Sequence, residues 1–266
     1  MLDILENIPP LCGIFDTHSH YDDDKFDGIR EELLDGLFEL GLEGIITCGC
    51  DIPSSEKALK LSEKYPKIYA AAGFHPENLP NTAPDLSSIR ELLKNKKAVA
   101  IGEIGLDYHW DIDKSLQKEW FEAQLKLSAE LDIPVIVHDR EAHSDTLSLL
   151  QKYPVKGVVH CFSGSVDTAK EILKLGMYIG IGGVVTFKNA RKTVEVAEML
   201  PGDRILLETD CPYLAPEPYR GKLCHSGLIA FTAKRIAEIR GVSETEIRQK
   251  SFENADRLFG LSQIQI

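Results

Sequence analysis

The sequence predicts an α/β protein built as a single (β/α)8 TIM barrel, and two observations lead to this prediction. Eight short apolar segments alternate with helix-like segments along the chain, as expected of parallel strands that are covered on both faces. The chemically distinctive residues stand where these segments end, and the strand ends of a barrel converge on one mouth. The 266 residues suit one barrel of about 250 residues, so we expect one domain over residues 1–266.

The eight expected strands are short and apolar on both faces. In chain order they cover residues 12–17, 44–48, 68–73, 98–102, 135–137, 157–160, 178–181 and 205–208. Helical patterns lie between them, and the clearest covers residues 115–131, with Asp113 as the expected N-cap. An open, doubly wound sheet is the alternative arrangement. It is disfavoured because the strand ends of an open sheet spread along a line, whereas those of a closed barrel converge.

Six residues suited to binding a metal ion stand in or beside these segments: His18, His20, Glu103, His138, His160 and Asp210. Neutral imidazole and carboxylate are the ligands that divalent hydrolytic metals prefer. In an extended chain His18 and His20 point to the same side and can bind one ion together. Asp210, on the eighth strand, comes next to the first strand when the barrel closes. It can complete this first ligand shell and accept a proton from a bound water.

A second ion is expected beside the first. His138 and His160 end adjacent strands and form its predicted ligand pair, while Glu103 lies between the two histidine groups and can bridge both ions. The cofactor prediction is therefore two divalent metal ions at the C-terminal mouth. Histidines suit Zn or Mn, whereas carboxylates and a phosphate substrate suit Mg, so all three metals remain open.

Four further residues are candidates for binding substrate. His75, in the segment GFHP, is a candidate phosphate contact or proton donor, and His109 is a candidate for orienting substrate. Arg220 and Lys222 follow the eighth strand and are expected to form a cationic patch beside the site. The alternative for these two cations is ordinary solvated surface.

The composition limits the partners and the cellular compartment that we expect. A formal net charge of −12 argues against a protein that coats nucleic acid, which would carry a basic stripe. No apolar run reaches the roughly 18 residues of a membrane span, and the acidic N-terminal segment lacks the basic region of a signal peptide. Six cysteines without a disulfide framework fit the same picture. We therefore expect a cytoplasmic protein without a membrane partner, and no exposed apolar stripe requires more than a monomer.

Several segments, in order, resemble the TatD family of metal-dependent deoxyribonucleases. The matching stretches include FDTHSH, GFHPE, AIGEIGLDYHW, GVVHCFSGS and LLETDCPYLAPEPYRGK, and the resemblance runs from residue 15 to residue 261. It implies a barrel that binds two divalent metals and cleaves phosphodiester bonds, commonly as a 3′–5′ exonuclease on DNA, single-stranded DNA included. The chain departs from many relatives after Lys222, where they continue with an Asn and a Pro, whereas residues 223–226 here read LCHS. This departure concerns nucleotide preference rather than the metal chemistry.

The resemblance also implies roles for individual residues. The first metal's ligands would be His18, His20, Glu103 and Asp210, and the second metal's ligands would be Glu103, His138 and His160. His75 would contact a substrate phosphate. The leading hypothesis is hydrolysis of DNA by a metal-activated water, with Asp210 and Glu103 as catalytic residues.

Two other functions remain open. The same two-metal site would serve a hydrolase of another ester, such as D-aminoacyl-tRNA. A non-catalytic protein with a structural metal is disfavoured, because structural sites are usually closed and rich in cysteine, whereas this one is open and built from histidine and carboxylate.

Overall fold

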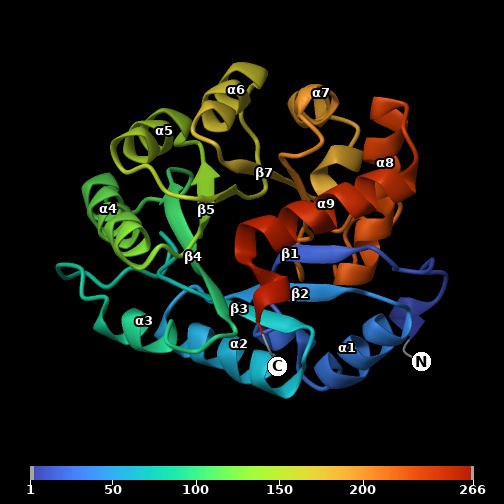
Figure 1. Cartoon of the computed structure of the whole chain (residues 1–266), viewed down its shortest axis with the longest axis horizontal. Helices are drawn as coiled ribbons and strands as arrows, with labels where there is room; N and C mark the ends of the chain where they lie inside the picture. The colour runs from blue at the N-terminus through green and yellow to red at the C-terminus, as the bar shows by residue number, and fades with distance from the viewer. Residues whose placement is uncertain (1–2, 265–266) are drawn as a thin grey trace.

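The computed structural model describes residues 3–264 and contains eight strands in one parallel sheet, each paired with the next along the chain. The strands are β1 Phe15–Ser19, β2 Gly44–Cys48, β3 Ile68–Ala72, β4 Ala98–Asp107, β5 Val135–Arg140, β6 Gly157–Val159, β7 Tyr178–Ile181 and β8 Ile205–Leu207. Figure 1 shows the helices arranged around these strands. The predicted alternation of strands and helices is therefore confirmed.

Helices that connect successive strands cover the outside of the sheet, and two further helices follow β8 (Figure 1). They are α1 Arg30–Glu39, α2 Ile52–Lys64, α3 Ser87–Leu92, α4 Lys114–Leu131, α5 His143–Lys152, α6 Val166–Lys174, α7 Arg191–Met199, α8 Ile229–Arg240 and α9 Glu244–Phe259. Helix α4 begins one residue before the predicted start, and Asp113 caps it by accepting from the backbone N–H groups of Ser115 and Leu116. Within residues 3–264, no helix combines the length and apolar character that a bilayer span requires.

The sheet closes between β1 and β8, so the barrel prediction is confirmed and the open sheet is excluded. Ser19 forms a parallel bridge with Cys211. The hydroxyl of Thr17 donates to the carbonyl of Leu207 at 3.0 Å, and the Asp210 N–H donates to the carbonyl of His18 at 3.0 Å. The closing contacts thus place Asp210 directly beside the histidines of β1.

Helix α9 covers the N-terminal end of the barrel. Asn254 donates to the carbonyls of Gly202 and Ile205, which lie before and at the start of β8. The ring of Phe252 stacks on Phe15, the first residue of β1, with centroids 6.1 Å apart. Buried residues of α9 join the inward-facing strand residues in one apolar cluster. This end is closed, so the C-terminal ends of the strands form the accessible mouth.

Several strand boundaries differ from the predicted ones in ways that affect the site. Strand β5 continues to Arg140 rather than ending at residue 137, so His138 lies inside it. Strand β1 begins at Phe15 rather than at residue 12, because Gly13 adopts a φ of 77° and the preceding residues form a turn. Strand β4 continues to Asp107 rather than ending at residue 102. Glu103 is therefore inside a strand and not at its end, and β4 carries a second buried carboxylate, Asp107, four residues further on.

Candidate metal centre

The first group of candidate ligands lies where β1 meets the segment after β8. The Nε2 atoms of His18 and His20 are 3.1 Å apart, so the two rings share one side of the extended chain as predicted. The carboxylate of Asp210 points between them, with Oδ1 3.5 Å from Nε2 of His18 and 3.3 Å from Nε2 of His20. All three atoms therefore converge on one point.

The second group lies across the mouth, on β5 and directly after β6. Nδ1 of His138 is 3.3 Å from Nε2 of His160. The ring of His160 also stacks on that of His18, with centroids 3.9 Å apart and an interplanar angle of 12°. The two histidine groups are thus in direct contact.

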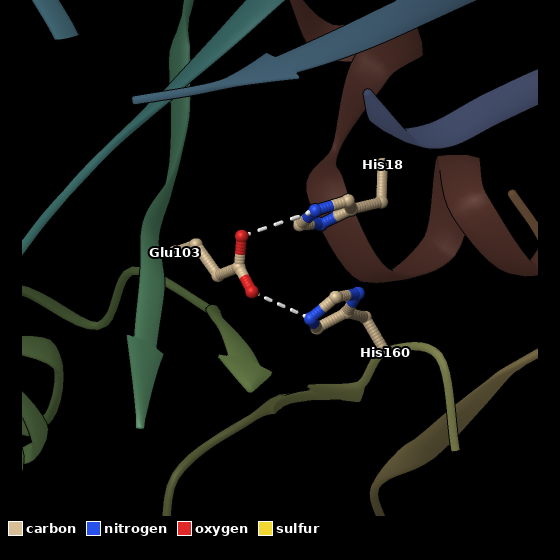
Figure 2. Close-up of side chains that lie close together, drawn as sticks. All are labelled: His18, Glu103 and His160. Carbon is tan, nitrogen blue, oxygen red and sulfur yellow. Dashed lines mark ion pairs between the residues drawn. The ribbon is translucent and has the colours of Figure 1, made fainter. Parts of the chain in front are cut away.

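Glu103 stands between the groups and divides its two oxygens among them. Its Oε2 is 3.2 Å from Nε2 of His18 and 3.4 Å from Nε2 of His20. Its Oε1 is 2.6 Å from Nε2 of His160 and 2.7 Å from Nδ1 of His138. Figure 2 shows the carboxylate reaching His18 with one oxygen and His160 with the other. This arrangement matches the position expected of a bridging ligand.

His75 lies inside this cluster rather than at its edge. It follows β3, is buried, and places Nε2 3.5 Å from Oε1 of Glu103, so that it forms one group with Glu103 and His138. The sequence predicted His75 as a substrate contact. Its place at the end of a predicted strand is the same signal that identified the other histidines, and it would have supported a role as a ligand as well.

Hydrogen bonds fix which ring nitrogens face the centre. Nδ1 of His20 donates to the backbone carbonyl of Cys48 at 2.9 Å, and Nε2 of His138 donates to Oδ2 of Asp107 at 2.9 Å. The opposite nitrogen of each neutral ring then carries a lone pair, and that lone pair points at the oxygens of Glu103 and Asp210. Acceptors that face acceptors in a buried site need positive charge between them, either a metal ion or the proton that makes a histidine a cation. The donor set therefore fits divalent metal ions.

Without a metal ion, protons on the histidines supply this charge. Burial alone would raise the pKa of Glu103, but the surrounding histidines, when protonated, hold that pKa well below its usual range. Burial likewise opposes ionisation of Asp210, yet hydrogen bonds from His18 and His20 keep its pKa low. Burial lowers the pKa of His138, but its bonds to Asp107 and Glu103 outweigh this and raise it to about 9. The carboxylates stay ionised, and the cluster attracts positive charge.

Three carboxyl groups that were not predicted as ligands form hydrogen bonds with the candidate ligands or with residues beside them. Asp107 accepts from His138, as described above. Asp16, fully buried on β1, accepts from the hydroxyls of Thr209 at 2.6 Å and Ser226 at 2.7 Å, and so ties β1 to the segments after β8. Glu208 accepts from the backbone N–H of Cys161, directly after His160, and burial raises its pKa to about 8. These residues hold the candidate ligands in place.

Three of the predicted substrate residues are outside the cluster. His109 lies in the loop after β4, where its Nδ1 pairs with Oε1 of Glu141 at 3.1 Å. Arg220 and Lys222 are exposed after β8, and the guanidinium of Arg220 lies over the ring of Phe187 at 4.3 Å. The structure records no contact of these two cations with a candidate ligand among the described residues. Their role in binding substrate stays a prediction.

Comparisons with known proteins match this architecture over nearly the whole chain. A family model described as TatD related DNase matches residues 15–260. The metal-dependent hydrolase YabD from Bacillus subtilis is 42% identical over 254 residues, covering 94% of this chain and 100% of the relative. The 3′-5′ ssDNA/RNA exonuclease TatD from Pantoea ananatis is 33% identical, covering 93% and 100%. The crystal structure of YjjV, a TatD homologue from Escherichia coli, superposes with a TM-score of 0.87 at 33% identity, covering 94% and 99%.

Proposed function

The chain belongs to the family of TatD related DNases and is a metal-dependent hydrolase, and on this premise we propose that it cleaves phosphodiester bonds in DNA as a 3′–5′ exodeoxyribonuclease. The observation that carries the proposal is the division of the two Glu103 oxygens between the two histidine groups. One carboxylate shared by two sets of donors suits two cations held side by side. Such a pair of cations suits an anionic phosphodiester.

Different residues would hold each of the two ions. His18, His20 and Asp210 would hold one ion, His138 and His160 the other, and Glu103 both. Ions bound there would lower the pKa of a water and offset the charge of the phosphate. His75, beside Glu103 at the second group, offers an additional nitrogen to that group or to a substrate phosphate.

The two carboxylates differ in exposure, which suggests different roles. The side chain of Asp210 is 20% exposed, whereas that of Glu103 is 4% exposed. Asp210 therefore meets solvent and is ionised, so it would orient the attacking water and take its proton. Glu103 is enclosed by histidines and would serve to hold the two histidine groups at a fixed separation.

The test is cleavage of single-stranded DNA that carries a label at its 5′ end. The metal-loaded chain should give a ladder that shortens from the 3′ end, and a 3′-end label should be released at once as a mononucleotide. The variant Glu103→Ala should give neither product. The matched control, Glu195→Ala, removes an exposed glutamate that pairs with Arg191 on α7 and should cleave as the wild type does.

Two results would count against the proposal. Cleavage of circular single-stranded DNA would show an endonuclease, because a circle offers no 3′ end. No cleavage of DNA with Mg, Mn or Zn, together with hydrolysis of an aminoacyl-tRNA ester, would assign the same site to the alternative substrate.

A further inference from the structure

The large apolar side chains that the described residues expose follow strands at the mouth of the barrel, on opposite sides of it. Over residues 3–264 they are Trp110, 47% exposed, Tyr213, 45% exposed, and Leu214, 37% exposed. Trp110 follows β4, and the other two follow β8. These are the elements that supply Glu103 and Asp210. Exposed aromatic residues at the rim of a binding site commonly contact a ligand.

The indole of Trp110 is held in place by polar and charged neighbours. The ring of His109 meets it edge-on, with centroids 5.1 Å apart and an interplanar angle of 82°. His109 is in turn paired with Glu141 at 3.1 Å. The guanidinium carbon of Arg140 lies 5.9 Å from the indole centroid. The side chain is therefore oriented by its surroundings while much of its surface stays open.

A hollow of about 420 Å³ lies next to the indole, lined by the continuous segment of residues 108–114. This volume falls in the range of about 300–1,000 Å³ that is typical of small-ligand sites. Tyr108 and Lys114 also line it, with the Lys114 ammonium 4.2 Å from the centre of the Tyr108 ring. The hollow thus combines aromatic surfaces with the ammonium of Lys114 and the carboxylates of Asp111 and Asp113, and Arg140 adds a second cation near the indole.

The strand register connects this hollow to the candidate metal centre. Gly105 of β4 pairs with His138 of β5, and Asp107 pairs with Arg140. Arg140 therefore lies two residues beyond His138, which is about 7 Å along the strand. Asp107, whose Oδ2 is 4.0 Å from the Arg140 guanidinium, also contacts His138. A nucleic acid strand that passes over the cluster would reach Trp110 within a nucleotide or two.

We propose that this hollow binds an unpaired nucleobase of the substrate strand, stacked on Trp110, with Arg140 contacting a phosphate of the same strand. This inference rests on the proposed function and adds a subsite that holds a base of the substrate beside the metal centre. An aromatic platform takes any base, because every base has a π-face, whereas the bases of a duplex are already stacked on their neighbours. The platform therefore selects single-stranded ends.

The chain offers a direct optical test. It contains two tryptophans, and Trp120 is only 1% exposed. In the variant Trp120→Phe, emission comes from Trp110 alone. A phosphorothioate-linked hexamer of thymidine, which resists cleavage, should quench this emission in a saturable manner. A hexamer with the same backbone but without bases should leave it unchanged. If Trp120→Phe does not fold, the same titration in the wild type serves, since buried Trp120 contributes a constant background.

Binding by variants gives the second readout. Trp110→Ala should bind the thymidine hexamer about 5- to 100-fold more weakly, as expected for the loss of one stacked base, and should bind the abasic hexamer as the wild type does. Trp110→Phe should recover most of the affinity because it retains an aromatic face.

The failure of this inference can be told apart from that of the proposed function. Equal quenching by both hexamers, or unchanged thymidine-hexamer binding by Trp110→Ala in a chain that cleaves DNA, would overturn the stacking platform alone. Absence of cleavage of any oligonucleotide with Mg, Mn or Zn would overturn the proposed function on which it rests.

Discussion

Oδ2 of Asp107 lies 2.9 Å from Nε2 of His138, on the side of the ring opposite to Glu103. Both carboxylates come from β4, four residues apart, so they point to the same face of the strand. Asp107 accepts the Nε2 proton, so when the ring is neutral the lone pair of Nδ1 is directed at the cluster. One long strand therefore supplies both a candidate ligand and the residue that sets the tautomer of its neighbour.

Removing Asp107 should weaken metal binding without removing a ligand. In Asp107→Ala the His138 ring loses its fixed tautomer and orientation, and we expect metal affinity to fall about 10- to 100-fold. Competition with a chromophoric chelator measures this change. Asp203→Ala, an exposed aspartate paired with Arg204 before β8, is the matched control and should bind metal as the wild type does. An unchanged affinity of Asp107→Ala would show that the hydrogen bond does not tune His138.

Removing Asp16 should destabilise the closure of the barrel. Its fully buried carboxylate accepts from the Thr209 backbone and hydroxyl and from the Ser226 hydroxyl. In Asp16→Ala these donors lose their partner in a site closed to water, so the free energy of unfolding should fall by about 3 kcal/mol. Urea denaturation measures it. Asp24→Ala removes an exposed carboxylate paired with Lys57 and should cost less than about 1 kcal/mol. Equal losses in the two variants would contradict the account.

His225 should make stability depend on pH. It is buried, its Nε2 donates to the Ile4 carbonyl at 3.1 Å, and burial lowers its pKa to about 4. The unfolded chain has a histidine pKa of about 6.5 and takes up this proton first as the pH falls. The contribution is therefore favourable above pH 6.5 and is lost towards pH 4. Because of His225, the free energy of unfolding should fall by about 2 kcal/mol between pH 7.5 and pH 5.

The variant His225→Gln separates this contribution from other titrations. Glutamine keeps a donor for the Ile4 carbonyl but does not titrate. Metal-free wild type and variant should lose different amounts of unfolding free energy between the two pH values, by about 2 kcal/mol. Urea denaturation at both pH values measures the difference, and identical losses would show that His225 is not the titrating group.

Most of the fold could be predicted because apolar runs and helix signals are local. The runs at residues 44–48 and 178–181 coincide with β2 and β7, and the N-cap of α4 follows from a single aspartate. The end of β4 could not be predicted, because Gly102 and Glu103 interrupt the apolar run. The strand continues there through its pairing with β5, which is a contact between segments far apart in the chain.

The residues of the candidate site likewise include some that the sequence could predict and some that it could not. The histidines of β1, β5 and β6 stand beside apolar runs, and the sequence therefore identified them. Asp107 and Asp16 carry no such signal, because their importance depends on partners that only the closed barrel brings near. His75 carries the same signal, although the sequence predicted it as a substrate contact rather than as a ligand.

The central claim is that Glu103 joins two adjacent metal sites, and the metal content of Glu103→Gln tests it most directly. Glutamine keeps the size of glutamate but has one acceptor oxygen and one donor nitrogen, so it can serve only one of the two histidine groups. Equilibrium dialysis against Mn²⁺, followed by elemental analysis, counts the bound ions. Glu195→Gln on α7 is the control.

We predict two ions for each wild-type and control chain and no more than one for Glu103→Gln, with hydrolysis of DNA lost in that variant. Two ions bound to Glu103→Gln with wild-type affinity would contradict a bridging role and with it the proposed two-metal site.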